Sequence, residues 1–98
     1  MKEMRPTTGK VVLALFNILG SLRENSFLDL FSGSGQIAIE AFKKGASPVY
    51  SVESERKRAA EIAKKAPDGV KCLCMDARRA VGRFAKNGEK FDIIFADP

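Results

Sequence analysis

The sequence contains no histidine and no tryptophan. Without histidine, the chain cannot form a Ser-His-Asp or Cys-His nucleophilic triad, a histidine metal site or a histidine acid-base centre. Its two cysteines, Cys72 and Cys74, are too few for a four-ligand zinc site and poorly spaced for a disulfide with each other. We therefore expect no metal site, and two small buried thiols in a reduced compartment.

Long apolar runs are also missing. No stretch of about 18 apolar residues occurs, so we expect no membrane span and no membrane partner. The first residues, 1–5, lack the apolar core and cleavage site of a signal peptide. These absences predict a cytoplasmic chain, and 98 residues are enough for one small domain at most.

Basic residues outnumber acidic residues: the chain has 17 Lys and Arg and 12 Asp and Glu, which gives a net charge of +5. The excess is spread along the chain, with small basic clusters at 56–58, 64–65 and 78–79. Such a balance is compatible with a nucleic-acid partner, but clusters of this size are usually solvated helix faces.

What the chain does have is a regular alternation of helical and strand-like segments. After Thr7 or Thr8, apolar residues up to Leu22 recur at helical spacing. The later segments predict strands at 27–31, 49–52, 70–74 and 91–96, and helices at 36–44, 55–65 and 77–86. Strands joined by single helices imply right-handed crossovers and a parallel sheet covered on both faces. The predicted fold is therefore α/β, the first half of a Rossmann-like doubly wound sheet with strand order 3-2-1-4.

The fourth strand would lie at the outer edge of this sheet, where it presents Ile93, Ile94 and Phe95. An apolar strand left as an open edge is an aggregation hazard. We therefore expect residues 1–98 to be part of a longer domain, or a homodimer to cover this edge.

The most informative local pattern is Asp29-Leu30-Phe31-Ser32-Gly33-Ser34-Gly35, between the first strand and a helix. Glycines at 33 and 35 let the backbone turn tightly and approach a ligand, and the helix behind them offers free N–H groups. Glu53 follows at the end of the second strand, where an acidic side chain binds ribose hydroxyls in doubly wound folds. Together these features indicate a cofactor that contains a nucleoside.

A dinucleotide-binding protein is a competing interpretation, because Gly33, Gly35 and Ala38 loosely match its fingerprint. Asp29 argues against it, since a carboxylate there suits a cationic ligand and would repel a pyrophosphate. Asp97-Pro98 argues the same way, because it would stand at the carboxyl end of the fourth strand, facing the crevice.

These segments resemble a known family. Residues 29–35 resemble the first motif of the S-adenosylmethionine-dependent methyltransferases, and 91–98 are similar to the start of their Asp/Asn-Pro-Pro-Tyr motif. The segments 5–8, 15–19, 35–41 and 44–47 are similar to bacterial 16S ribosomal RNA guanine-N2 methyltransferases. Relatives of this kind carry a basic, Gly-rich segment before Arg5 and continue beyond Pro98. We therefore expect residues 1–98 to be a partial S-adenosylmethionine-binding domain.

The resemblance implies cofactor-binding roles for residues of the three predicted strand ends. Asp29 would lie near the cofactor's ammonium group, and Phe31, Gly33 and Gly35 belong to the turn that packs against its methionine part. Glu53 would hold the ribose. Asp76 would accept a hydrogen bond from the adenine amino group, beside the backbone N–H of Ala77.

The resemblance also implies direct transfer of a methyl group to an amine. Asp97, with Pro98, would accept a hydrogen bond from the guanine amine. Such a reaction depends mainly on positioning, which suits a chain without histidine. The implied partner is ribosomal RNA or the small ribosomal subunit. A non-catalytic cofactor- or RNA-binding fragment is the alternative, and an NAD(P)-binding protein is the less favoured one.

Several residues have structural interpretations that stay open at this stage. Asp76 precedes a helix and also suits an N-cap. Glu55 suits a first-turn partner of the helix dipole, and Glu40 and Asn17 suit either a helix surface or the crevice. Arg5 is compatible with a contact to RNA, a contact to the cofactor, or a place in a free terminus. Arg78, Arg79 and Arg83 are compatible with phosphate contacts or with a solvated helix face.

Overall fold

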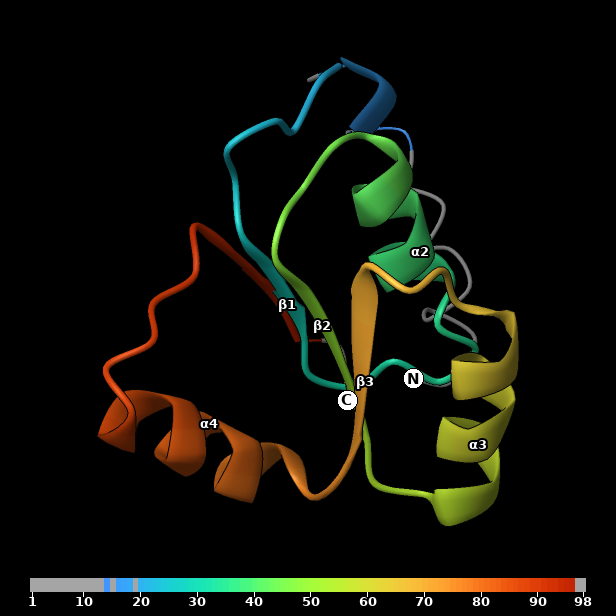
Figure 1. Cartoon of the computed structure of the whole chain (residues 1–98), viewed down its shortest axis with the longest axis vertical. Coiled ribbons are helices and arrows are strands. Elements are labelled where there is room, and N and C mark those ends of the chain that lie inside the picture. The colour runs from blue at the N-terminus through green and yellow to red at the C-terminus, as the bar shows by residue number, and fades with distance from the viewer. Residues whose placement is uncertain (1–13, 15, 19, 97–98) are drawn as a thin grey trace.

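A four-stranded parallel sheet with helices on both faces forms the protein (Figure 1). The computed structural model describes residues 14, 16–18 and 20–96. Ala14 and Phe16–Ile18 are helical, and the rest of the helix predicted after Thr7 or Thr8 lies outside the described residues. The remaining elements are β1 (Phe27–Asp29), α2 (Gln36–Lys43), β2 (Val49–Glu53), α3 (Arg56–Lys65), β3 (Val70–Cys74), α4 (Ala77–Lys86) and β4 (Ile93–Phe95).

The strand order is β3-β2-β1-β4, which confirms the predicted 3-2-1-4 topology. All three neighbouring pairs are parallel, with Phe27 opposite Val49 on one side and Ile93 on the other. The strands therefore end together along one side of the sheet, at the lower edge in Figure 1. We call this side, where Asp29 and Glu53 end their strands, the carboxyl edge.

Alternation along the strands divides the core into two layers. Phe27, Val49 and Val70 point to the side of α2 and α3, where Phe16 packs edge-on against Phe27 with ring centroids 5.7 Å apart. Ala38 and Ala41 of α2 are fully buried in this layer. Their small side chains let the helix lie close to the sheet.

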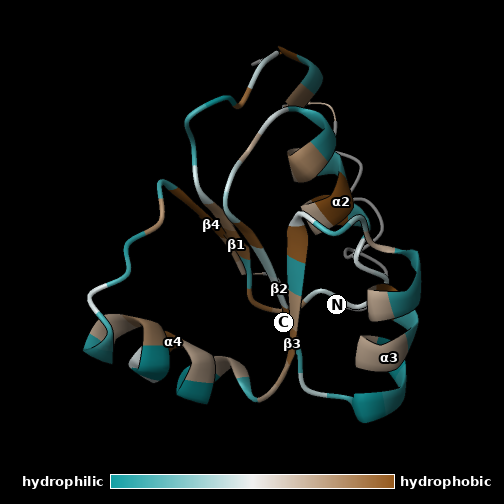
Figure 2. Cartoon of the chain, in the orientation of Figure 1, coloured by the Kyte–Doolittle hydropathy of each residue, from teal (hydrophilic) through white to brown (hydrophobic). Residues whose placement is uncertain are grey.

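On the opposite face, α4 is the one helix among the described residues that packs against the sheet. Its Phe84 meets Tyr50 of β2 and Phe91, and the three rings pack edge to face with centroids 5.0–5.5 Å apart. Figure 2 shows the apolar side of α4 turned toward the sheet and its polar side turned away. Burial, and then the carboxylate of Glu89, raise the pKa of the Tyr50 hydroxyl.

Two strands are shorter than predicted. The first strand stops at Asp29 rather than Phe31, because the chain turns into the loop before α2. The fourth spans Ile93–Phe95 rather than 91–96, and just before it the Asp92 carboxylate accepts a hydrogen bond from the Ser26 N–H at 2.8 Å. α2 ends at Lys43, and Gly45 follows its C-cap with φ of 102°.

The edge position of β4 also agrees with the prediction. Ile94 is 57% exposed, and among residues 20–96 no strand pairs with its outer side. An apolar hollow of about 410 Å³ lies beside it, and its lining includes Leu28, Val81 and Phe84. A homodimer through this edge stays a prediction. No helix within the described part of the chain is long and apolar enough to cross a membrane.

Candidate functional site

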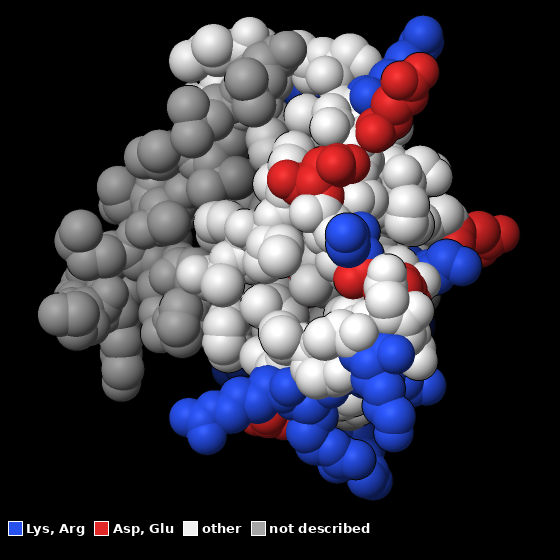
Figure 3. Space-filling model, turned by 90° about the vertical axis from the view of Figure 1, so that its left-hand side faces the viewer, with Lys and Arg blue, Asp and Glu red and all other residues white. Residues whose placement is uncertain are grey.

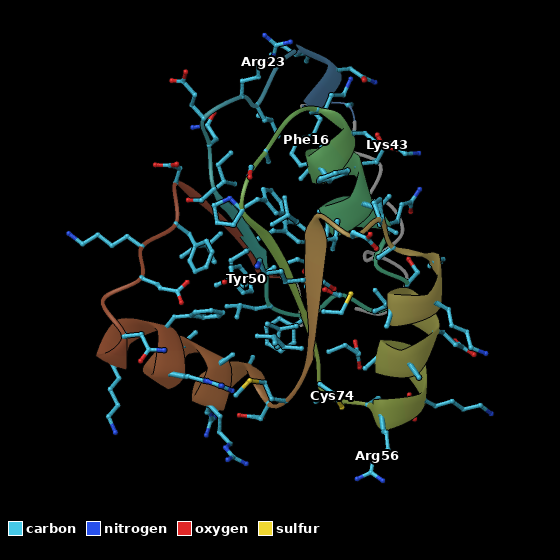
Figure 4. All side chains as sticks on the ribbon, in the orientation of Figure 1. Phe16, Arg23, Lys43, Tyr50, Arg56 and Cys74 are labelled. Carbon is cyan, nitrogen blue, oxygen red and sulfur yellow. The ribbon has the colours of Figure 1, made fainter. Side chains whose placement is uncertain are left out.

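The carboxyl edge gathers the predicted cofactor residues from three strands. Asp29 is the last residue of β1 and Glu53 the last of β2, and both are buried, at 1% and 7% exposure. Asp76 follows β3 and is exposed. Figure 4 labels Cys74 and Arg56 at the same edge. The predicted catalytic residues Asp97 and Pro98 lie outside the described residues.

The loop between β1 and α2 is fastened to β2 through Ser32. Its N–H donates to the Val52 carbonyl at 3.0 Å, and its carbonyl accepts from the Gly35 N–H at 2.8 Å. The Ser51 hydroxyl donates to the Ser32 hydroxyl at 2.6 Å, and both side chains are buried. Sequence reasoning missed this pair, although a serine inside the apolar strand around position 51 was a signal for it.

The two glycines of the loop have different requirements. Gly33 and Gly35 both have left-handed φ, 57° and 82°. A Cβ on Gly35 would lie 2.9 Å from Ile62 Cγ2 of α3, so this glycine is required by packing within the protein. A Cβ on Gly33 would meet nothing within 4 Å. The outer side of the loop at Gly33 is therefore open, and a cofactor role for either glycine stays a prediction.

Glu53 joins the loops that follow β1 and β2. Its Oε1 accepts a hydrogen bond from the Gly33 N–H at 2.8 Å, and its Oε2 accepts one from the Glu55 N–H at 2.9 Å. The Arg58 guanidinium lies 3.9 Å from Oε2. Because an ionised carboxylate has about four acceptor positions, these contacts fix its orientation and leave capacity for ligand hydroxyls.

Asp29 directly precedes the loop, at the end of β1. Its Oδ1 accepts a hydrogen bond from the Phe31 N–H at 3.2 Å, which shapes the start of the turn. The Phe31 side chain is 40% exposed at the surface of the same loop. A buried acid that precedes a loop with an exposed ring and an open glycine suits a cationic ligand group.

Asp76 is the N-cap of α4, which confirms the structural interpretation of this residue. Its Oδ2 accepts from the Arg78 and Arg79 N–H groups at 3.0 and 3.4 Å. Ala77 begins the helix, so its N–H has no partner within α4. A cap through one carboxylate oxygen is compatible with a second contact, and the predicted adenine contacts of Asp76 and Ala77 stay predictions.

Other candidates turn out to be surface or capping groups. Glu55 is the N-cap of α3 and accepts from the Arg58 N–H at 2.8 Å, instead of acting only through the helix dipole. Glu40 pairs with Lys43 at 3.7 Å, and Asn17 accepts from the Lys44 ammonium at 3.1 Å. Arg5 lies outside the described residues.

The two thiols differ in exposure. Cys74 is exposed, so the prediction that both cysteines are buried is wrong for it, because its side chain emerges at the end of β3. Cys72 is half-buried, and burial raises the pKa of its thiol. No group of three or more His, Cys, Asp or Glu that suits a metal ion occurs in the part of the chain that the structure describes.

The residues at the carboxyl edge fit S-adenosylmethionine, the cofactor that the resemblance implies. A fixed carboxylate with spare acceptor positions at Glu53 suits a ribose diol. The buried acid Asp29 suits an ammonium group, and the open side of Gly33 offers backbone to the methionine part. The described residues therefore suit the ribose and the ammonium group of the cofactor.

Two curated relatives of this chain are named as rRNA methyltransferases. The putative rRNA methyltransferase YlbH of Bacillus subtilis is 35% identical over 104 residues, covering 96% of this chain and 54% of the relative. The ribosomal RNA small subunit methyltransferase D of Buchnera aphidicola is 33% identical over 101 residues, covering 99% and 51%. The chain thus spans about half the length of these relatives.

Solved structures agree on the fold. A conserved hypothetical protein from Streptococcus pyogenes is similar at a TM-score of 0.73 and 38% identity, over 87% of this chain and 55% of that one. The putative methyltransferase yhhF from Escherichia coli is similar at a TM-score of 0.67 and 24% identity, over 91% and 51%. The family model described as Conserved hypothetical protein 95 matches residues 1–98. The chain therefore belongs to this family, and the names of its curated relatives show that the family is one of methyltransferases.

Proposed function

We propose that this chain is the cofactor-binding part of an S-adenosylmethionine-dependent RNA methyltransferase. Its substrate in this proposal is 16S ribosomal RNA, on the naked strand or within the small ribosomal subunit, and its target is the exocyclic N2 amine of a guanine. The reaction belongs in the cytoplasm, with its RNA. The names of the relatives support ribosomal RNA as the substrate class, and the resemblance of residues 91–98 to an amine-presenting motif supports the target.

The observation that carries the proposal is the fixed, buried carboxylate of Glu53 at the end of β2. It lies at the edge where doubly wound sheets bind nucleosides, directly beside an open glycine turn. A carboxylate held there by two backbone N–H groups offers its remaining lone pairs to a diol without first reorganising.

The residues of the chain would act by binding and orientation. When bound, S-adenosylmethionine supplies a methyl group on a sulfonium. Glu53 would hold the ribose hydroxyls and Asp29 would pair with the ammonium, so that the cofactor has one orientation. Asp97 would accept a hydrogen bond from the guanine amine and aim its nitrogen toward the cofactor. Positioning of this kind needs no histidine as acid or base.

Methyl transfer tests the proposal. Radiolabelled S-adenosylmethionine is incubated with this chain and either 16S RNA or small subunits, and the RNA is digested to nucleosides. We expect label in N2-methylguanosine, and its loss with Asp97→Ala. Label in another nucleoside would refute the guanine N2 target. Cofactor binding without any transfer would favour the alternative, a non-catalytic cofactor-binding fragment.

A further inference from the structure

α4 carries a row of cations without a matching acid. Arg78, Arg79, Arg83 and Lys86 are all exposed, and the helix contains no Asp or Glu. None of the four forms an ion pair with a described residue. Figure 3 shows Lys and Arg side chains gathered along the lower rim of the face on which α4 lies. We call these four residues the α4 cation face.

Packing of α4 fixes the direction of this face. Ala80 and Phe84 are 0% and 6% exposed against the sheet, so the opposite side of the helix must face solvent. Arg79, Arg83 and Lys86 follow the spacing of one helix stripe. At a rise of about 1.5 Å per residue, this stripe is about 10 Å long. It therefore forms a row rather than a single point of charge.

The row begins at the candidate site. Asp76, which caps α4, follows β3 at the carboxyl edge, so Arg78 and Arg79 lie within one helical turn of that edge. Arg56 and Lys57 at the start of α3 are exposed at the same edge. A polyanion that crosses α4 would thus reach the edge where the cofactor residues meet.

We propose that the α4 cation face binds the phosphate backbone of RNA and leads the strand to the carboxyl edge. The inference rests on the proposed function and adds the surface that holds its substrate. Three of the four cations are arginines, whose planar guanidinium groups bind phosphate oxygens in pairs. An anionic membrane fits less well, because a helix that lies on lipid needs its apolar side free, and Ala80 and Phe84 are buried.

Fluorescence anisotropy with a short labelled RNA tests the proposal. The variant is Arg79→Gln/Arg83→Gln/Lys86→Gln, and the matched control is Lys64→Gln/Lys65→Gln/Lys71→Gln, which removes equal charge near the opposite edge of the sheet. The logarithm of the association constant falls linearly as the logarithm of the salt concentration rises. Loss of three phosphate contacts should make this slope shallower by about 2 and weaken binding about tenfold. The control should bind nearly as wild type does.

Four outcomes would overturn the inference. The first three are equal losses in the two variants, wild-type affinity in the α4 variant, and displacement of the RNA by polyglutamate at matched charge. Vesicles of anionic lipid that bind the chain while RNA does not would also overturn it. Calorimetry with S-adenosylmethionine separates this inference from the proposed function, because the α4 variant should bind the cofactor as wild type does.

Discussion

Glu53 illustrates how one residue can organise the site before a ligand arrives. Its carboxylate joins the N–H groups of Gly33 and Glu55, so the turns after β1 and β2 are held together. The same orientation suits ribose hydroxyls. The proposed binding role thus falls on a residue that also has a structural role, and a useful substitution must therefore keep the side-chain shape while removing the charge.

Gly35→Ala should destabilise the protein more than Gly33→Ala. Both changes force a left-handed φ on alanine, which costs about 1 kcal/mol. At Gly35 the new Cβ also collides with Ile62, which adds about 1–3 kcal/mol. Urea denaturation monitored by circular dichroism measures both. Equal free energies of unfolding for the two variants would contradict the packing role of Gly35.

At this scale the sequence predicted residue types better than contacts. Glu53 at the end of a strand and Asp76 before a helix followed from spacing. The Ser32–Ser51 hydrogen bond did not, because it joins residues 19 positions apart that only the folded sheet brings together. Nor did the exposure of Cys74, since alternation alone does not show where a strand edge leaves the core.

At the scale of elements, α4 shows most clearly how the spacing of apolar and charged residues in the sequence predicts which side of a helix packs against the sheet. Its cations and its apolar residues lie on opposite sides of the helix, and the bounds predicted for it, 77–86, are those of the structure. The capping carboxylate of Asp76 marks its start. Strand bounds were harder to predict, because β1 ends and β4 begins where tertiary contacts turn the chain.

Gly82→Ala should stabilise α4. Gly82 lies inside the helix with ordinary φ, and a Cβ there would meet nothing within 4 Å. Alanine has a higher helix propensity than glycine, so the free energy of unfolding should rise by about 0.5–1 kcal/mol. Thermal melts check this, with RNA affinity as a second readout. A lower melting temperature would show that α4 is packed more tightly at this position than the structure indicates.

At the scale of the whole molecule, topology brings the site together. Order 3-2-1-4 followed from the handedness of crossovers, and it aligns the ends of β1 and β2 at one edge. Within the part of the chain that the structure describes, the same order leaves α4 as the one helix on its face, where its cations are exposed. The chain spans about half the length of its curated relatives, so its activity on RNA is a proposal.

The central claim is that the carboxyl edge binds S-adenosylmethionine, and isothermal titration calorimetry tests it most directly. Wild-type chain, Glu53→Gln and the control Glu61→Gln, an exposed glutamate of α3, are each titrated with S-adenosylmethionine, its demethylated product and NADH. We predict saturable binding of the first two ligands to wild type and Glu61→Gln, and at least about tenfold weaker binding to Glu53→Gln, since a hydrogen bond to a charged group contributes about 1.5–3 kcal/mol. NADH binding with no response to the other two ligands would contradict the account.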